Sequence, residues 1–106
     1  MDTQVVDVPE KGRFEIRLDG RVVGLASYHV DGTTMTLPHT EVDPAVGGQG
    51  LGTALVAGVL AAARERGLTV LPYCSFVRRY IQQHPETLDL VDEQDRPTFG
   101  LATADR

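Results

Sequence analysis

The stretch EVDPAVGGQGLGTALV, residues 41–56, joins a β-branched apolar run to a segment with helical periodicity. Glycines occupy positions 47, 48, 50 and 52 of this junction. The first turn of a helix has backbone N–H groups without internal partners, and the helix dipole makes that end positive. Because glycine has no side chain, an anion can approach these amides closely. The stretch therefore predicts either a phosphate site or a merely flexible connection with a tight packing contact.

The residues after the junction predict a helix and then a strand. Residues 51–66 carry apolar side chains at spacings of three and four, and Gly67 supplies a helix stop. The run LTVLPYC, residues 68–74, is short and almost continuously apolar, which is typical of a strand covered on both faces. A crossover of this kind places the strands before and after the helix parallel.

A second helix is expected over SFVRRYIQQH, residues 75–84, with Ser75 as its N-cap. A further short helix is expected over residues 85–91, where proline occupies the first position. The helix over 75–84 would direct a set of four side chains inward: Phe76, Val77, Tyr80 and Ile81.

The residues before the junction predict an antiparallel meander. Alternation in RFEIRL, residues 13–18, indicates a half-buried strand, and Asp-Gly pairs separate it from strands over 21–30 and 33–42. Pro38 cannot donate a ladder hydrogen bond, so it indicates an edge, a bulge or a splay in the third strand. The expected fold class is α+β, a β-β-β-α-β-α core with a mixed, mostly antiparallel sheet.

The two ends of the chain show weaker patterns. Residues 1–12 are expected to be a loose lead-in, although the valines at 5, 6 and 8 also suit an edge strand. Residues 92–106 are polar and are expected to trail along the surface or fray. A chain of 106 residues predicts one domain.

Composition excludes several classes of protein. The net charge of −5 disfavours general binders of nucleic acids or membrane surfaces, because both partners are polyanionic. The single cysteine, Cys74, excludes an internal disulfide framework. No apolar run approaches the roughly 20 residues that cross a bilayer. A cytoplasmic protein without nucleic-acid or membrane partners is therefore expected, and no residue set indicates a metal site.

Two common phosphate motifs do not match the glycine junction. A P-loop requires lysine followed by serine or threonine after its last glycine, and GLGTAL lacks that pair. A dinucleotide fingerprint requires an acidic residue roughly 20 positions later, where this chain has LTVLPYC. The junction therefore needs another explanation.

Three separated motifs, HTEV at 39–42, GGQGLG at 47–52 and CSFV followed by Tyr80 and HPE, occur in one order. In this order they resemble the GNAT N-acetyltransferase superfamily, in its smallest single-domain branch, across residues 13–91. The resemblance implies acetyl-CoA, with its pyrophosphate on the glycine loop and its pantetheine between strands splayed at 39–42 and 69–74. Gly47 departs from the usual arginine or glutamine. The implied cofactor-binding residues are Val42, Gly47, Gly48, Gln49, Gly50, Leu51, Gly52 and Thr53.

Four residues are candidates for catalysis. Glu41 is placed as a general base, directly or through water, or else it is a solvated charge at a strand end. His39 shares its strand face and either contacts substrate or is structural. Cys74 is placed either as an acetyl-accepting nucleophile at a helix N-terminus or as a small buried side chain. The resemblance implies that Tyr80 protonates the CoA thiolate; otherwise it is an aromatic core residue.

These residues support three functions. The first is acetyl-CoA-dependent transfer of an acetyl group to a primary amine of a small molecule or protein, directly or through acetylated Cys74. The second is a module that binds CoA or acyl-CoA with little or no catalysis. The third is a scaffold for a partner protein. The oligomeric state, monomer or homodimer, stays open, because the meander leaves an edge that can pair with a second copy.

Overall fold

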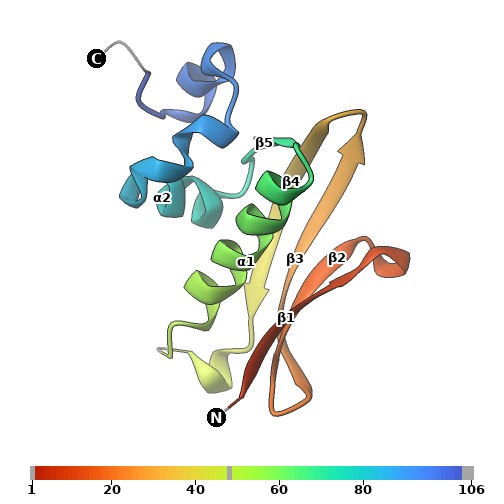
Figure 1. Ribbon diagram of the computed structural model, residues 1–106. Helices are drawn as coiled ribbons and strands as arrows, with labels where there is room; N and C mark the ends of the chain where they lie inside the picture. The colour runs from red at the N-terminus through yellow and green to blue at the C-terminus, as the bar shows by residue number, and fades with distance from the viewer. Residues whose placement is uncertain (1, 48, 104–106) are drawn as a thin grey trace.

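A five-stranded sheet with strand order β1-β2-β3-β4-β5 forms the frame of the molecule in a computed structural model that describes residues 2–47 and 49–103. The first four strands pair antiparallel, and β5 pairs parallel to β4. Helix α1 lies along one face of the sheet, and α2 follows β5 at one end (Figure 1). The strands are β1 (Thr3–Val8), β2 (Arg13–Leu18), β3 (Arg21–Asp31), β4 (Thr34–Val42) and β5 (Thr69–Leu71), and the α-helices are α1 (Leu51–Glu65) and α2 (Ser75–Gln83).

The predicted α+β fold class is confirmed, with a mixed sheet and the expected meander, crossover helix and second helix. The first Asp-Gly pair forms a tight turn in which Asp19 and Gly20 both have positive φ, 50° and 86°. Strand β5 is shorter than predicted. The prediction that Ser75 is the N-cap of α2 is wrong: Cys74 occupies the N-cap position, and Ser75 is the first residue of the helix.

Of the two expectations for the N-terminus, the edge strand is confirmed and the loose lead-in is wrong. Residues 3–8 form β1, which pairs with all of β2 from Thr3 opposite Leu18 to Val8 opposite Arg13. Val5 of this strand packs against the core. Pairing with β2 supplies the backbone partners that a six-residue segment cannot provide for itself.

The expectation of a trailing C-terminal segment is also wrong for the residues that the structure describes. Short 3-10 helices span Pro85–Leu90 and Glu93–Phe99, and two further ones span Pro9–Lys11 and Pro44–Val46. Phe99 is buried and its ring meets Tyr73 edge-on at 5.1 Å between centroids. The buried Arg96 donates from Nε to the carbonyl of Val91 at 3.0 Å. The segment closes one end of the core.

The core lies between the sheet and the helices. It contains aliphatic side chains from four strands and both helices, because the apolar stripe of α1 faces the sheet. Side chains that are almost completely buried include Ile16, Met35, Leu37, Leu55, Val56, Val59, Leu60, Val70, Val77 and Ile81.

A β-bulge interrupts β4 at the position where Pro38 predicted an irregularity. Ser27 lies opposite His39 and His29 opposite Thr36, so Leu37 and Pro38 together face the single residue Tyr28. An extra residue reverses the alternation of side chains along a strand. Met35 and Leu37 are buried before the bulge, whereas His39 and Glu41 are exposed after it.

The sheet opens beyond the bulge. Strand β5 pairs with only the first three residues of β4, Thr34 to Thr36. The amide of Cys74 then donates to the carbonyl of Leu37 at 2.9 Å, and no ladder bond joins β4 to this segment farther along, within the described residues. The second half of β4 therefore has a free side, as the predicted splay requires.

Candidate functional site

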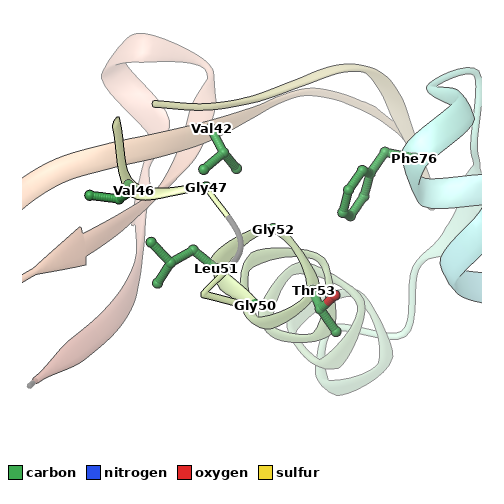
Figure 2. A pocket seen from close by; sticks show the side chains of 8 residues that line it. All are labelled: Val42, Val46, Gly47, Gly50, Leu51, Gly52, Thr53 and Phe76. Carbon is green, nitrogen blue, oxygen red and sulfur yellow. The ribbon is translucent and has the colours of Figure 1, made fainter. Parts of the chain in front are cut away.

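A cleft of about 250 Å3 lies at the N-terminus of α1. Figure 2 shows its walls, which come from the end of β4, the loop before α1, the first turn of α1 and the start of α2. The lining residues are Val42, Val46, Gly47, Gly50, Leu51, Gly52, Thr53 and Phe76.

Glycine is favoured at two positions at the start of α1, for a different physical reason at each. Gly50 caps the helix with φ of 72°, a conformation that favours glycine, and no atom lies within 4 Å of where its Cβ would be. A Cβ at Gly52 would lie 2.7 Å from Cζ of Phe76, so the ring occupies the space that a larger residue would need. The backbone of this turn is therefore open on the side of Gly50 and covered by an aromatic ring at Gly52.

The first turn of α1 presents backbone donors to the cleft. The amide of Ala54 donates to the carbonyl of Gly50 at 3.0 Å, which is the first bond of the helix. The amides of Leu51, Gly52 and Thr53 precede that bond and lie at the positive end of the helix dipole. This arrangement suits an anion such as a diphosphate.

A second hollow, of about 280 Å3, adjoins the cleft through two residues, Thr53 and Phe76, that line both. It is otherwise lined by Arg79, Tyr80 and Gln83. The Tyr80 ring stacks on His84 at 3.9 Å between centroids, and Nδ1 of His84 lies 2.8 Å from the carbonyl oxygen of Tyr80. Tyr80 thus lies in the hollow beside the cleft, and its ring packs against His84, one helical turn later.

The thiol of Cys74 lies across the gap from β4. Its Sγ donates to Oγ1 of Thr40 at 3.4 Å, and the side chain is partly buried. Burial alone would raise the pKa of the Cys74 thiol. The hydrogen bond with Thr40 and the backbone amides of Val77 and Phe76 outweigh burial, so this pKa is lowered. A lowered pKa increases the thiolate fraction, which is the nucleophilic form.

His39 and Glu41 form a pair on the other face of the sheet. Nε2 of His39 lies 2.7 Å from Oε2 of Glu41, and their side chains are 55% and 64% exposed. Glu41 lines a hollow of about 190 Å3 with residues of β3 that include Val22 and Leu25, and no residue of α1 or α2 lines it. The bulge in β4 produces this placement because it turns Thr40 and Val42, rather than His39 and Glu41, toward the helices.

The predicted site residues thus fall into three groups. Val42, Gly47, Gly50, Leu51, Gly52 and Thr53 line one cleft, with Tyr80 in the adjoining hollow; Gln49 is exposed and lines neither, and Gly48 lies outside the described residues. Cys74 faces Thr40, and His39 and Glu41 lie on the opposite face of β4. The cleft with the free helix amides, the Cys74 thiol and the His39–Glu41 pair therefore occupy separate places around the end of β4.

Sequence reasoning missed three residues of this region. Phe76 was expected in the core, but its side chain is 38% exposed and lines the cleft. Val46 lines the same cleft from the 3-10 turn before the glycines. Thr40 lies within the HTEV motif, yet only the bulge turns it toward Cys74. The one signal in the sequence was that Thr40 lies two residues before Val42, so that both side chains lie on the same face of the strand.

Two general properties complete the description of this region. No helix within residues 2–47 and 49–103 is long and apolar enough to span a bilayer. The same residues contain no group of three or more histidine, cysteine, aspartate or glutamate side chains that could hold a metal ion.

Comparison with protein families and solved structures identifies the architecture. The family model for GCN5-related N-acetyl-transferase matches residues 13–90. No curated protein matches the chain significantly. The solution structure of a GCN5-like putative N-acetyltransferase from Staphylococcus aureus has a TM-score of 0.64 and 25% identity, covering 84% of this chain and 87% of that one.

Two larger proteins match over a shorter region. The ribosomal-protein-S18-alanine N-acetyltransferase from Escherichia coli has a TM-score of 0.52 and 29% identity, covering 55% of this chain and 38% of its own. A GNAT family acetyltransferase from Brucella melitensis, in complex with acetyl-CoA, has a TM-score of 0.51 and 25% identity, covering 64% of this chain and 50% of its own. The chain therefore spans half or less of the length of these two relatives.

Proposed function

The chain belongs to the GCN5-related N-acetyltransferase family, and on this premise we propose that it binds acetyl-CoA and transfers the acetyl group to a primary amine. The acceptor is an amine of a small molecule or of a protein. The cytoplasmic location expected from the sequence stays a prediction.

One observation carries the proposal: the cleft at the N-terminus of α1 and the gap beside β4 lie on the same face of that strand. Val42 lines the cleft, and Thr40, two residues earlier, faces Cys74 across the gap. A ligand with a diphosphate at one end and an extended arm suits this path. The resemblance of the Brucella melitensis acetyltransferase, which has acetyl-CoA bound, supports the same ligand.

The residues at the start of α1 fit a diphosphate. The free amides of Leu51, Gly52 and Thr53 would hold it, and the open space at Gly50 leaves room for its oxygens. Main-chain donors need no side chain at Gly47, where the family more often has arginine or glutamine. Acetyl-CoA, when bound, supplies the activated acetyl group.

The groups around the end of β4 would handle the protons. Because Glu41 lies on the face of β4 opposite Cys74, it would take the proton of the acceptor amine through water, with His39 2.7 Å away to share it. Tyr80 would donate a proton to the departing thiolate. Where transfer is not direct, the Cys74 sulfur would form a bond to the acetyl carbon as the CoA thiol leaves, and the amine would then displace that sulfur.

A second function, binding of CoA or acyl-CoA without transfer, has its own supporting observation. The candidate base and the thiol do not converge, because His39 and Glu41 lie on the sheet face opposite Cys74. Tyr80 is also engaged with His84. A binding module would use the cleft alone.

Calorimetric titration with CoA, followed by intact mass analysis after incubation with acetyl-CoA, separates these functions. An enzyme binds CoA saturably and gives either a mass increase of one acetyl group at Cys74, absent in Cys74→Ala, or product in a panel of primary amines. Saturable binding with neither result identifies the binding module. Absence of any CoA binding contradicts both.

A further inference from the structure

Strand β1 forms an edge of the sheet (Figure 1), and half of its backbone groups point outward. The amide of Asp19 donates to the carbonyl of Asp2 at 2.8 Å, which sets the alternation along the strand. In an antiparallel pair every second residue bonds to the neighbouring strand, so even-numbered residues of β1 bond to β2. The outward N–H and C=O groups belong to Thr3, Val5 and Asp7, and no described residue pairs with them.

This edge lacks most of the usual protection against pairing. Natural edge strands carry charged side chains, especially lysine, or proline, a bulge or a covering segment, and Asp7 is the one such feature of β1. The sequence of β1, TQVVDV, contains neither lysine nor proline, and its register with β2 is unbroken over six residues. A strand of this length with free donors and acceptors is a template for another strand.

A groove of about 430 Å3 lies on α1 and includes Gly58, the residue of α1 that approaches Val5. A Cβ placed at Gly58 would lie 2.9 Å from Cγ1 of Val5, so the helix and the edge strand are in close contact there. The groove is larger than the cleft at the start of α1. Its lining consists of small and charged residues, Gly58, Ala61, Ala62, Arg64 and Glu65. We call the outward groups of Thr3, Val5 and Asp7 together with this groove the β1/α1 surface.

The one acidic side chain of β1 does not oppose association. The carboxylate of Asp7 accepts a hydrogen bond from the Tyr28 hydroxyl at 2.8 Å and pairs with Arg66 at 2.8 Å. Its charge is therefore balanced within the chain, and its side chain is only 20% exposed.

We propose that the β1/α1 surface joins two copies of this chain, with β1 pairing antiparallel to β1 of the second copy about a two-fold axis at Val5. In such a pair, a residue whose backbone N–H and C=O point outward lies opposite a residue of the second copy whose backbone groups also point outward. The side chains of the two residues then lie on the same face of the sheet. Val5 then lies opposite Val5, and Thr3 opposite Asp7, which gives about six backbone hydrogen bonds. No like charges are opposed.

The groove explains why a second copy fits better than an unrelated strand. Gly58 contacts Val5, so the axis at Val5 brings the two grooves toward each other. Small side chains at Gly58, Ala61 and Ala62 leave room for the helices to approach across the axis. The result is a continuous ten-stranded sheet (five strands from each copy) with both α1 helices on one face.

Light scattering coupled to gel filtration tests this arrangement at about 100 μM chain. The native protein is expected at twice 11.5 kDa. Val5→Pro removes an outward N–H that β2 does not use, and Ala61→Arg fills the groove, so both variants are expected to be monomers. The matched control Thr98→Arg adds the same charge at an exposed position on the last 3-10 helix and is expected to stay dimeric.

Hydrogen exchange gives a second readout. In the dimer the amides of Val5 and Asp7 exchange at least tenfold more slowly than in the Ala61→Arg monomer, because only pairing between copies protects them. A native monomer, or a dimer that Ala61→Arg leaves intact, overturns the proposal. Should Val5→Pro fail to fold, Ala61→Arg and the exchange rates still decide.

Discussion

Sγ of Cys74 lies 3.4 Å from Oγ1 of Thr40, across the gap that opens where β4 and the segment after β5 separate. These two residues are 34 positions apart, and the bulge at Leu37 and Pro38 brings them to the same face. The contact stabilises the thiolate, because a hydroxyl can donate to the ionised sulfur.

Thr40→Val is therefore expected to raise the pKa of the Cys74 thiol. Loss of this hydrogen bond to the ionised sulfur is expected to leave roughly tenfold less thiolate at neutral pH. The pH dependence of alkylation by iodoacetamide measures the shift. Thr36→Val, on the same strand, is the control and should leave the profile unchanged. An unaltered profile in Thr40→Val would show that the hydroxyl does not tune the thiol.

Gly52→Ala is expected to destabilise the protein by about 1 kcal/mol, because its new Cβ would lie 2.7 Å from Cζ of Phe76. The ring is the flexible end of a side chain, so it can move partly aside. Urea unfolding measures the cost. In a Phe76→Ala background the same substitution should stabilise the protein by up to about 1 kcal/mol, because alanine is a better helix former than glycine. Gly47→Ala, whose nearest contact would be an ordinary 3.4 Å, is the control.

Glu41→Gln is expected to lower kcat for acetyl transfer about 100-fold and to leave KM for acetyl-CoA unchanged. Glu41 lines the hollow on the open face of the sheet, away from the cleft at α1. Steady-state kinetics against both substrates provide the measurement. Glu10→Gln, at an exposed position in the turn after β1, serves as the control. A change in KM alone would place Glu41 in binding rather than proton transfer.

Glu15→Gln is expected to lower Tm by roughly 5 °C at pH 7, the size of effect expected when charge-assisted hydrogen bonds are lost from a domain of about 100 residues. Hydrogen bonds from Arg17 and Arg13 lower the pKa of the Glu15 carboxyl, whose side chain is 2% exposed beneath the two guanidinium groups.

The pH dependence follows from the sign of that shift. A lowered pKa in the folded state stabilises the protein fully above the ordinary value of 4.5, and the stabilisation disappears as pH falls through the lowered pKa. The Tm difference between the native protein and Glu15→Gln should therefore shrink below pH 4.5. A difference that stays constant down to pH 2 would contradict this assignment.

The sequence by itself determined the order of the elements from β2 to α2 and the glycine-rich start of α1, where the first backbone amides have no partner within the helix. These features depend on local rules: alternation in Arg13–Leu18, Asp-Gly turns, helical spacing after Leu51 and glycines at a helix N-terminus. The three motifs also identified the family, which the match over residues 13–90 confirms.

Only the tertiary structure decided which residues distant in sequence lie close together and which face of the sheet each side chain occupies. Residues 3–8 form a strand because their backbone groups pair with β2. Arg96 and Phe99 are buried because the C-terminal segment packs over one end of the core. The bulge in β4 decided that Thr40 faces Cys74 while His39 and Glu41 face away. One inserted residue reverses the direction of every later side chain in a strand, and the position of a bulge depends on pairing with a strand distant in sequence. For this reason the local pattern around Pro38 predicted an irregularity in the strand, but it did not predict which face Thr40, His39 and Glu41 would occupy.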